Sequence, residues 1–201
     1  MGGFLHPASG KILHRGKDIS RLNIRHLRRQ GLAYVPADRI HTGSAADATI
    51  EENMIINRRH EMFNIFLANR PLRSNFSNDL RNLYKIDIPG LKEKASTLSG
   101  GNLQKLILAR EINLFKDYIV FSQPTWGLDI ASSRFIMEEI AALRNKGAAV
   151  ILISTNLDEI IELSDRIIVM YRGKIAGEFQ NTQRFPIKEK IGKCMQGIDI
   201  K

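Results

Sequence analysis

The chain has 201 residues, of which 43% are hydrophobic and 25% charged, a balance typical of folded globular proteins that excludes wholesale disorder. A net charge of +9 favours polyanionic partners such as nucleotide phosphates, nucleic acid or an acidic membrane surface. The single cysteine, Cys194, excludes an internal disulfide, and no apolar run approaches the ~20 residues that cross a bilayer. The sequence therefore predicts a cytosolic protein without direct membrane insertion.

The first 50 residues predict a hairpin, a short helix and a buried strand. Residues 10–14 and 17–19 flank the turn-forming pair Arg15-Gly16, which is typical of a β-hairpin. Asn23 can cap a helix, and the apolar stretch 31–35 predicts a buried strand that Pro36 stops. Residues 36–49 are rich in Ala, Asp, Gly and Thr, and we expect a loop there.

A small helical subdomain is expected in the middle of the chain. Thr49 can cap a helix that begins at Ile50. From 63 to 87 the pattern is helical, but Pro71 and the polar stretch 74–75 are expected to break it.

Helices and strands alternate regularly in the remainder of the chain. The expected elements are a helix over 103–114, a buried strand over 118–121, a helix over 135–143, a buried strand over 148–153, a helix over 157–163 and a strand pair over 166–170 and 174–179. Short apolar strands between amphipathic helices predict an α/β fold with a mainly parallel sheet.

The sharpest local feature is the stretch LSGGNLQK at residues 98–105, where a loop is expected to become a helix. The adjacent Gly100 and Gly101 let backbone N–H groups approach a ligand without side-chain obstruction, and Ser99 adds a hydroxyl. The first turn of a helix also offers free N–H groups and the positive end of its dipole to an anion. Taken alone, Ser-Gly-Gly is better explained as a helix cap after a tight turn.

Several separated segments together resemble the ATP-binding-cassette (ABC) ATPases. The stretch 98–105 resembles the signature motif, in the spelling of the sugar and nucleoside import branch, and PTWGLD at 124–129 resembles the end of the Walker B segment and the D-loop. Further matches are 151–159 with the switch region, 164–175 with the closing strand pair, and 34–39 with the Q-loop region. The resemblance implies an ABC-ATPase (P-loop NTPase-like) fold, with a parallel core sheet, a β edge element and a helical subdomain.

The resemblance also implies the domain organisation, a partial ABC ATPase domain over 1–201. Its expected parts are a helical subdomain with the signature loop at about 50–103, a core formed by 9–49 and 104–180, and a C-terminal tail over 181–201. The family's Gly-rich phosphate loop should precede Gly10, and no Gly-Lys-Ser/Thr string occurs in the chain. We therefore expect a fold truncated at the N-terminus, with unpaired sheet edges.

The family's hydrolytic residues fall on positions with altered chemistry. Ser122 and Gln123 stand in place of an Asp-Glu pair, so the charge that supports magnesium and the carboxylate that accepts a proton from water are both missing. Thr155 stands in place of the switch histidine and Ala37 in place of the Q-loop glutamine. We expect no intact catalytic residue and no metal ligand in this chain, which should be inactive alone.

The intact residues are assigned by the resemblance to a partner's site. ABC ATPase domains dimerise head to tail, and each signature motif covers the ATP that the other domain holds. The residues expected to bind this nucleotide in trans are Ser99, Gly100, Gly101, Asn102 and Asp129. ATP and Mg would thus be bound through the site of a second ABC ATPase domain.

The chain resembles in particular the C-terminal ATPase domain of tandem sugar or nucleoside importers. This implies membrane permease subunits as partners and a cytoplasmic, peripheral position on the inner face of the cell membrane. A soluble ABC-type protein acting on nucleic acid and an interaction module without nucleotide are the alternatives. We expect no nucleic acid, because the aromatic residues do not interleave with the basic runs.

Overall fold

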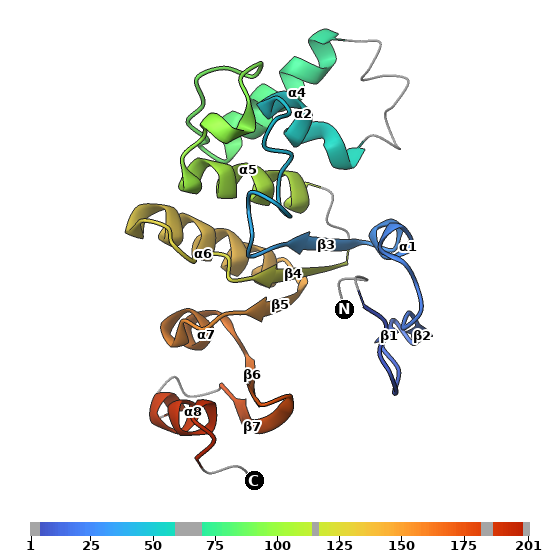
Figure 1. Ribbon diagram of the computed structural model, residues 1–201, viewed down its shortest axis with the longest axis vertical. Coiled ribbons are helices and arrows are strands. Elements are labelled where there is room, and N and C mark those ends of the chain that lie inside the picture. The colour runs from blue at the N-terminus through green and yellow to red at the C-terminus, as the bar shows by residue number, and fades with distance from the viewer. Residues whose placement is uncertain (1–4, 59–69, 114–116, 182–186, 199–201) are drawn as a thin grey trace. The chain divides into compact units, whose positions relative to one another are not determined.

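The computed structural model describes residues 5–58, 70–113, 117–181 and 187–198 (Figure 1). The chain divides into two compact units, Met1–Ile153 and Ser154–Lys201. The first unit holds the parallel sheet and most of the helices, and the second holds an antiparallel strand pair with two helices.

The predicted hairpin, helix and strand at the start of the first unit are confirmed. Strands β1 (Leu13–His14) and β2 (Lys17–Asp18) pair antiparallel. Helix α1 (Ile24–Arg29) begins after Asn23, whose side chain accepts a hydrogen bond from the His26 backbone N–H at 3.1 Å. Strand β3 (Leu32–Val35) follows and is largely buried.

Helices occupy most of residues 50–113 in the part of the chain that is described. They are α2 (Ile50–Ile55), the 3₁₀ turn η1 (Ile56–Arg58), α4 (Arg70–Leu83), the 3₁₀ turn η2 (Ala95–Thr97) and α5 (Gly100–Ile112). Residues 63–69 and Leu114, which the predicted helices included, lie outside the described residues.

The predicted break at the polar stretch 74–75 is wrong, because α4 runs continuously through it. Pro71 is the second residue of α4, where its ring and its missing N–H are tolerated. The polar residues after it bind the neighbouring helix α2. The Ser74 hydroxyl donates to Glu51 Oε1 at 2.7 Å, and Arg73 Nε lies 2.7 Å from Glu51 Oε2. These polar side chains therefore hold α4 against α2.

Helix α2 begins with a reciprocal cap. Thr49 Oγ1 accepts from the Glu52 backbone N–H at 3.2 Å, while Glu52 Oε2 accepts from the Thr49 backbone N–H at 2.8 Å. Behind this cap the side chains of Ile50 and Met54 are buried in the core, which fixes the helix against α4 and α5.

The cap of α2 is expected to stabilise the first unit measurably. Thr49→Ala should lower the free energy of unfolding by about 1 kcal/mol, because it leaves a backbone donor of the first turn unsatisfied. Urea denaturation followed by far-UV circular dichroism measures the change. Thr49→Ser keeps the hydroxyl and is the control, and equal stability of the two variants would contradict a role for the cap.

Strands β3, β4 (Tyr118–Ser122) and β5 (Ala149–Ile153) form a parallel sheet in that order. Helix α5 packs on β3, while α6 (Ile130–Asn145) packs on β5 and on α5 (Figure 1). The central strand β4 is buried, as predicted. Since the strands are parallel, the loops that follow β3 and β4 leave the same edge of the sheet.

The prediction that β5 is buried is wrong. Its end residues Ala149 and Ile153 are exposed and its middle residues are half-buried. Among the described strands, β5 pairs only with β4, so it is an edge strand of the described parallel sheet.

The second unit contains α7 (Leu157–Leu163), β6 (Arg166–Tyr171), β7 (Lys174–Gln180) and α8 (Ile187–Met195). The strands pair antiparallel, as predicted. The segment expected as a C-terminal tail contains α8, which packs on both strands and buries Ile191 and Cys194. Among the described helices of the chain, none is both long and apolar enough to cross a membrane.

Candidate functional site

The predicted signature segment forms the start of α5. Ser99 is the N-cap residue, and its hydroxyl accepts from the Asn102 backbone N–H at 3.3 Å. Ser99 and Gly100 are exposed. The segment is thus a helix cap, as the local pattern suggests, and at the same time it presents an accessible first turn with its positive dipole end.

Gly101 brings the signature segment against the turn that precedes α6. A Cβ at Gly101 would lie 2.5 Å from Ser132 Oγ and 3.5 Å from Asp129 Oδ2, so any side chain there would collide with the start of α6. Gly101 of the predicted signature motif and Asp129 of the predicted D-loop, which are far apart in the sequence, are therefore adjacent in the fold. Glycine is required at 101 for this close approach.

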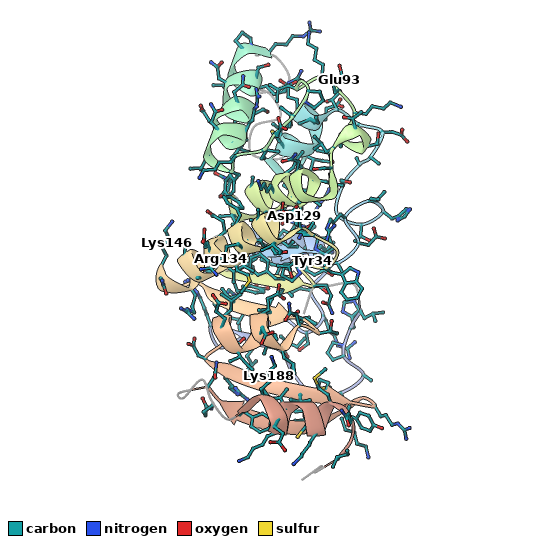
Figure 2. All side chains as sticks on the ribbon, turned by 90° about the vertical axis from the view of Figure 1, so that its left-hand side faces the viewer. Tyr34, Glu93, Asp129, Arg134, Lys146 and Lys188 are labelled. Carbon is teal, nitrogen blue, oxygen red and sulfur yellow. The ribbon has the colours of Figure 1, made fainter. Side chains whose placement is uncertain are left out.

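Asp129 is the N-cap of α6. Its Oδ1 accepts from the Ser132 backbone N–H at 2.8 Å and its Oδ2 accepts from the Ser132 hydroxyl at 2.7 Å. These hydrogen bonds hold the pKa of Asp129 below its ordinary value, so the carboxylate is ionised at neutral pH. Asp129, Arg134 and Lys146 follow one another along α6 (Figure 2).

Asn102 has a structural partner. Its side-chain oxygen accepts from the Asp87 backbone N–H at 3.0 Å, which ties the turn after α4 to the signature helix. Of the residues predicted to bind nucleotide, Ser99, Gly100 and Gly101 share one helix start with Asn102, and Asp129 lies beside Gly101.

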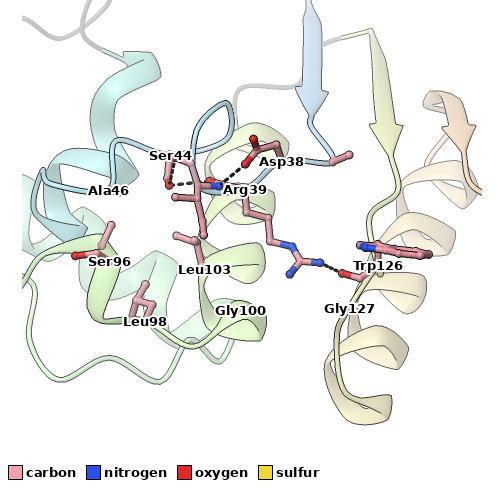
Figure 3. A pocket seen from close by; sticks show the side chains of 13 residues that line it. Asp38, Arg39, Ser44, Ala46, Ser96, Leu98, Gly100, Leu103, Trp126 and Gly127 are labelled. Carbon is pink, nitrogen blue, oxygen red and sulfur yellow. Dashed lines mark hydrogen bonds between the residues drawn. The ribbon is translucent and has the colours of Figure 1, made fainter.

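A cavity of about 340 Å³ opens beside this helix start (Figure 3). Its lining residues are Ala37, Asp38, Arg39, Ile40, Ser44, Ala46, Ala95, Ser96, Leu98, Gly100, Leu103, Trp126 and Gly127. They come from the loop after β3, from η2 and the start of α5, and from the turn after β4. Ala37, the expected Q-loop position, is among them and offers no polar side-chain group.

The altered positions after β4 lie at the carboxyl end of the sheet. Ser122 ends β4 and pairs with Ile153. Gln123 follows in the left-handed region, with φ +49°, and its backbone N–H donates to the Ile153 carbonyl at 2.7 Å. Thr155 belongs to the second unit, where it is exposed just before α7. Among the described residues, no group of His, Cys, Asp or Glu is arranged to hold a metal ion.

A buried charge cluster around Glu111 escaped the sequence analysis. Glu111 is fully buried on α5, and its Oε2 accepts from Arg28 Nη1 at 2.8 Å and from the Tyr34 backbone N–H at 3.2 Å. Its Oε1 accepts from Asn57 at 2.7 Å and from Arg110 Nε at 3.3 Å. The sequence signal that could have revealed this cluster is the adjacent charged pair Arg110-Glu111, which lies on the apolar face of a predicted helix.

Arg110 extends this cluster to the loop after β3. Its Nη2 donates to the Gly43 carbonyl at 2.8 Å, and burial lowers the pKa of its guanidinium while the carboxylate of Glu111 opposes that change. The cluster joins the sheet, the helical part and the loop that lines the cavity.

Comparison with known proteins shows to which family the chain belongs. The sequence profile of the ABC transporter family matches residues 1–125 of the chain. The chain belongs to this ABC transporter family. The family and fold class predicted from the sequence are thus confirmed.

Among similar curated proteins, a glucose import ATP-binding protein from Haloferax volcanii is 35% identical to this ABC chain, over 98% of the chain and 36% of that protein. A nucleoside import ATP-binding protein from Lactococcus lactis is 34% identical, over 98% of the chain and 39% of that protein. The chain therefore spans well under half of the length of these relatives.

Solved ABC structures share the fold at low sequence identity. A dimeric ATP-binding cassette in a post-hydrolysis state with ADP and Pi matches with a TM-score of 0.76 and 19% identity, over 90% of this chain and 78% of that chain. A nucleotide-free ATP-binding cassette matches with a TM-score of 0.75 and 21% identity, over 96% and 79% of the two chains.

Proposed function

We propose that this ABC chain is part of the ATP-binding component of an importer for a sugar or a nucleoside. The similarity to importer ATP-binding proteins supports this class of transport. In such an assembly its partners are a second ABC ATPase domain and membrane permease subunits, so its position is peripheral, on the cytoplasmic face of the membrane. The chain contributes its signature loop to the ATP that the second domain holds.

The observation that supports this proposal most strongly is the difference between the start of α5 and the end of β4. Ser99 and Gly100 form an accessible helix start with no side chain at position 100, which suits the approach of phosphate oxygens. Ser122 and Gln123, at the end of β4, offer no carboxylate. The residues present therefore fit a phosphate group at the signature loop and do not fit a magnesium ion after β4.

The chemistry of such a loop is electrostatic. Hydrolysis of ATP spreads negative charge over the oxygens of the transferred phosphoryl group, and fixed N–H donors aimed at those oxygens stabilise it. The N–H groups of the first turn of α5 and the Ser99 hydroxyl are held by the helix cap before any nucleotide arrives. The carboxylate that orients water would come from the second domain.

The chain alone is expected to hydrolyse Mg-ATP at the background rate. Gln123 can hydrogen-bond water, but its amide cannot accept the proton, and Ala37 and Thr155 supply no substitute base. Release of inorganic phosphate from the purified chain and from its Gln123→Ala variant should be equal. Turnover above background that Gln123→Ala removes would contradict the proposal.

A further inference from the structure

Arg39 is held in a fixed position beside the cavity. Its backbone carbonyl accepts from the Ser44 hydroxyl at 2.7 Å, and the Gly43 backbone N–H donates to the Asp38 carbonyl at 2.8 Å, which closes the turn. A Cβ at Gly43 would lie only 3.0 Å from Arg39 Cα, so the turn is tightly packed on the residue. The backbone of Arg39 is therefore fixed at the edge of the cavity.

The side chain of Arg39 spans from this turn to the segment after β4 (Figure 3). Its Nη2 donates to the Trp126 carbonyl. Its Nη1 lies 3.3 Å from the point where a Cβ at Gly100 would stand. The guanidinium thus lies next to the first turn of α5, the positive end of that helix dipole.

The positive charge of Arg39 has no counter-ion among the described residues. No carboxylate there lies within ion-pair distance of it, and burial alone lowers the pKa of its guanidinium. Its Nε is buried and has no hydrogen-bond partner within the described part of the chain. The neighbouring Asp38 carboxylate accepts instead from the backbone N–H groups of Ile40 and His41, at 3.0 and 2.9 Å.

A half-buried cation without a counter-ion, next to the positive end of a helix, attracts an anion. We propose that Arg39 binds a phosphate group at the mouth of the cavity, together with the first turn of α5. The guanidinium suits this task because its planar donors match phosphate oxygens. That the phosphate belongs to a nucleotide presented by a second ABC domain rests on the proposed function, and free inorganic phosphate is the other source of the same chemistry.

The only tryptophan of the chain provides a direct readout. Trp126 lines the cavity with its side chain exposed, and its carbonyl accepts the Arg39 bond. Titration of the 201-residue chain with sodium tripolyphosphate at constant ionic strength should give a saturable change in Trp126 emission. Tighter binding of ATP without metal than of inorganic phosphate favours a nucleotide as the source of the phosphate, whereas equal binding of the two favours free phosphate.

Variants connect the signal to Arg39. Arg39→Gln should weaken tripolyphosphate binding at least about tenfold, because a charge-assisted pair of hydrogen bonds is lost. Arg39→Lys keeps the charge and should be intermediate. Arg134→Gln is the matched control, since it removes the same charge from an exposed position on α6 and should bind as the unmodified chain does. Circular dichroism of each variant verifies the fold.

No emission change, or an equal one in Arg39→Gln and Arg39→Lys, would overturn the inference. Its failure can be distinguished from failure of the proposed function through Ser99→Arg in the assembled importer. If that variant stops ATP hydrolysis while tripolyphosphate binding is independent of Arg39, this inference alone is wrong. If Arg39 binds tripolyphosphate while Ser99→Arg leaves hydrolysis intact, the anion site stands and the role in the partner's site fails.

Discussion

Replacing Glu111 with alanine is expected to lower the free energy of unfolding by about 3–5 kcal/mol, the largest stability effect that the fold predicts. Glu111 is fully buried and accepts hydrogen bonds from Arg28, Arg110 and Asn57. Removing its carboxylate leaves Arg110, itself buried, with an uncompensated charge. Urea denaturation monitored by circular dichroism measures the loss.

Two further variants separate charge from packing at this position. Glu111→Gln keeps the shape but loses the charge, so it should destabilise nearly as much as alanine. Glu138→Ala removes an exposed partner of Arg134 on α6 and should change the free energy by no more than about 0.5 kcal/mol. Near-normal stability of Glu111→Gln would show that the carboxylate contributes only its volume.

Ser99→Arg is expected to reduce ATP hydrolysis by the assembled importer at least about 100-fold, since fixed donors at a developing charge are worth that much. Ser99 is exposed at the N-cap of α5, so a long side chain there covers the first turn. In the folded chain the substitution removes only the N-cap hydrogen bond of α5. The rate of phosphate release from the reconstituted importer is the measurement.

Two further variants test whether the loss of hydrolysis comes from covering the first turn of α5. Ser99→Ala removes the hydroxyl but leaves the N–H groups accessible, so its effect should be smaller. Arg134→Gln changes the charge of α6 away from the signature segment and should leave hydrolysis unchanged. Normal hydrolysis in Ser99→Arg would remove the basis for a role of α5 in the partner's site.

The elements that the sequence predicted well are those set by local chemistry. Asn23 and Thr49 cap their helices as expected, and α7 spans Leu157–Leu163, the same residues that the apolar spacing indicated. Caps and periodicity act over a few residues, so they are visible in a single sequence. The signature segment belongs to the same class, as it is a local turn and a helix start.

The features that the sequence could not give depend on contacts between distant segments. The exposure of β5 follows from its place in the sheet, and the burial of α8 follows from its packing on β6 and β7. The bond between Arg39 and the Trp126 carbonyl joins residues 87 positions apart. Neither residue carries a local pattern that predicts the other, so the candidate anion site was absent from the sequence analysis.

We propose that this chain's own site is idle and that its signature loop completes the site of a second domain. The most direct measurement is the position and number of Mg-ATP molecules trapped by the assembled pair of ABC domains. We expect a single nucleotide, held by the second domain and photo-crosslinked to residues 98–105 of this chain, with no crosslink in Ser99→Arg. A nucleotide bound against Ser122 and Gln123 of this chain would contradict it.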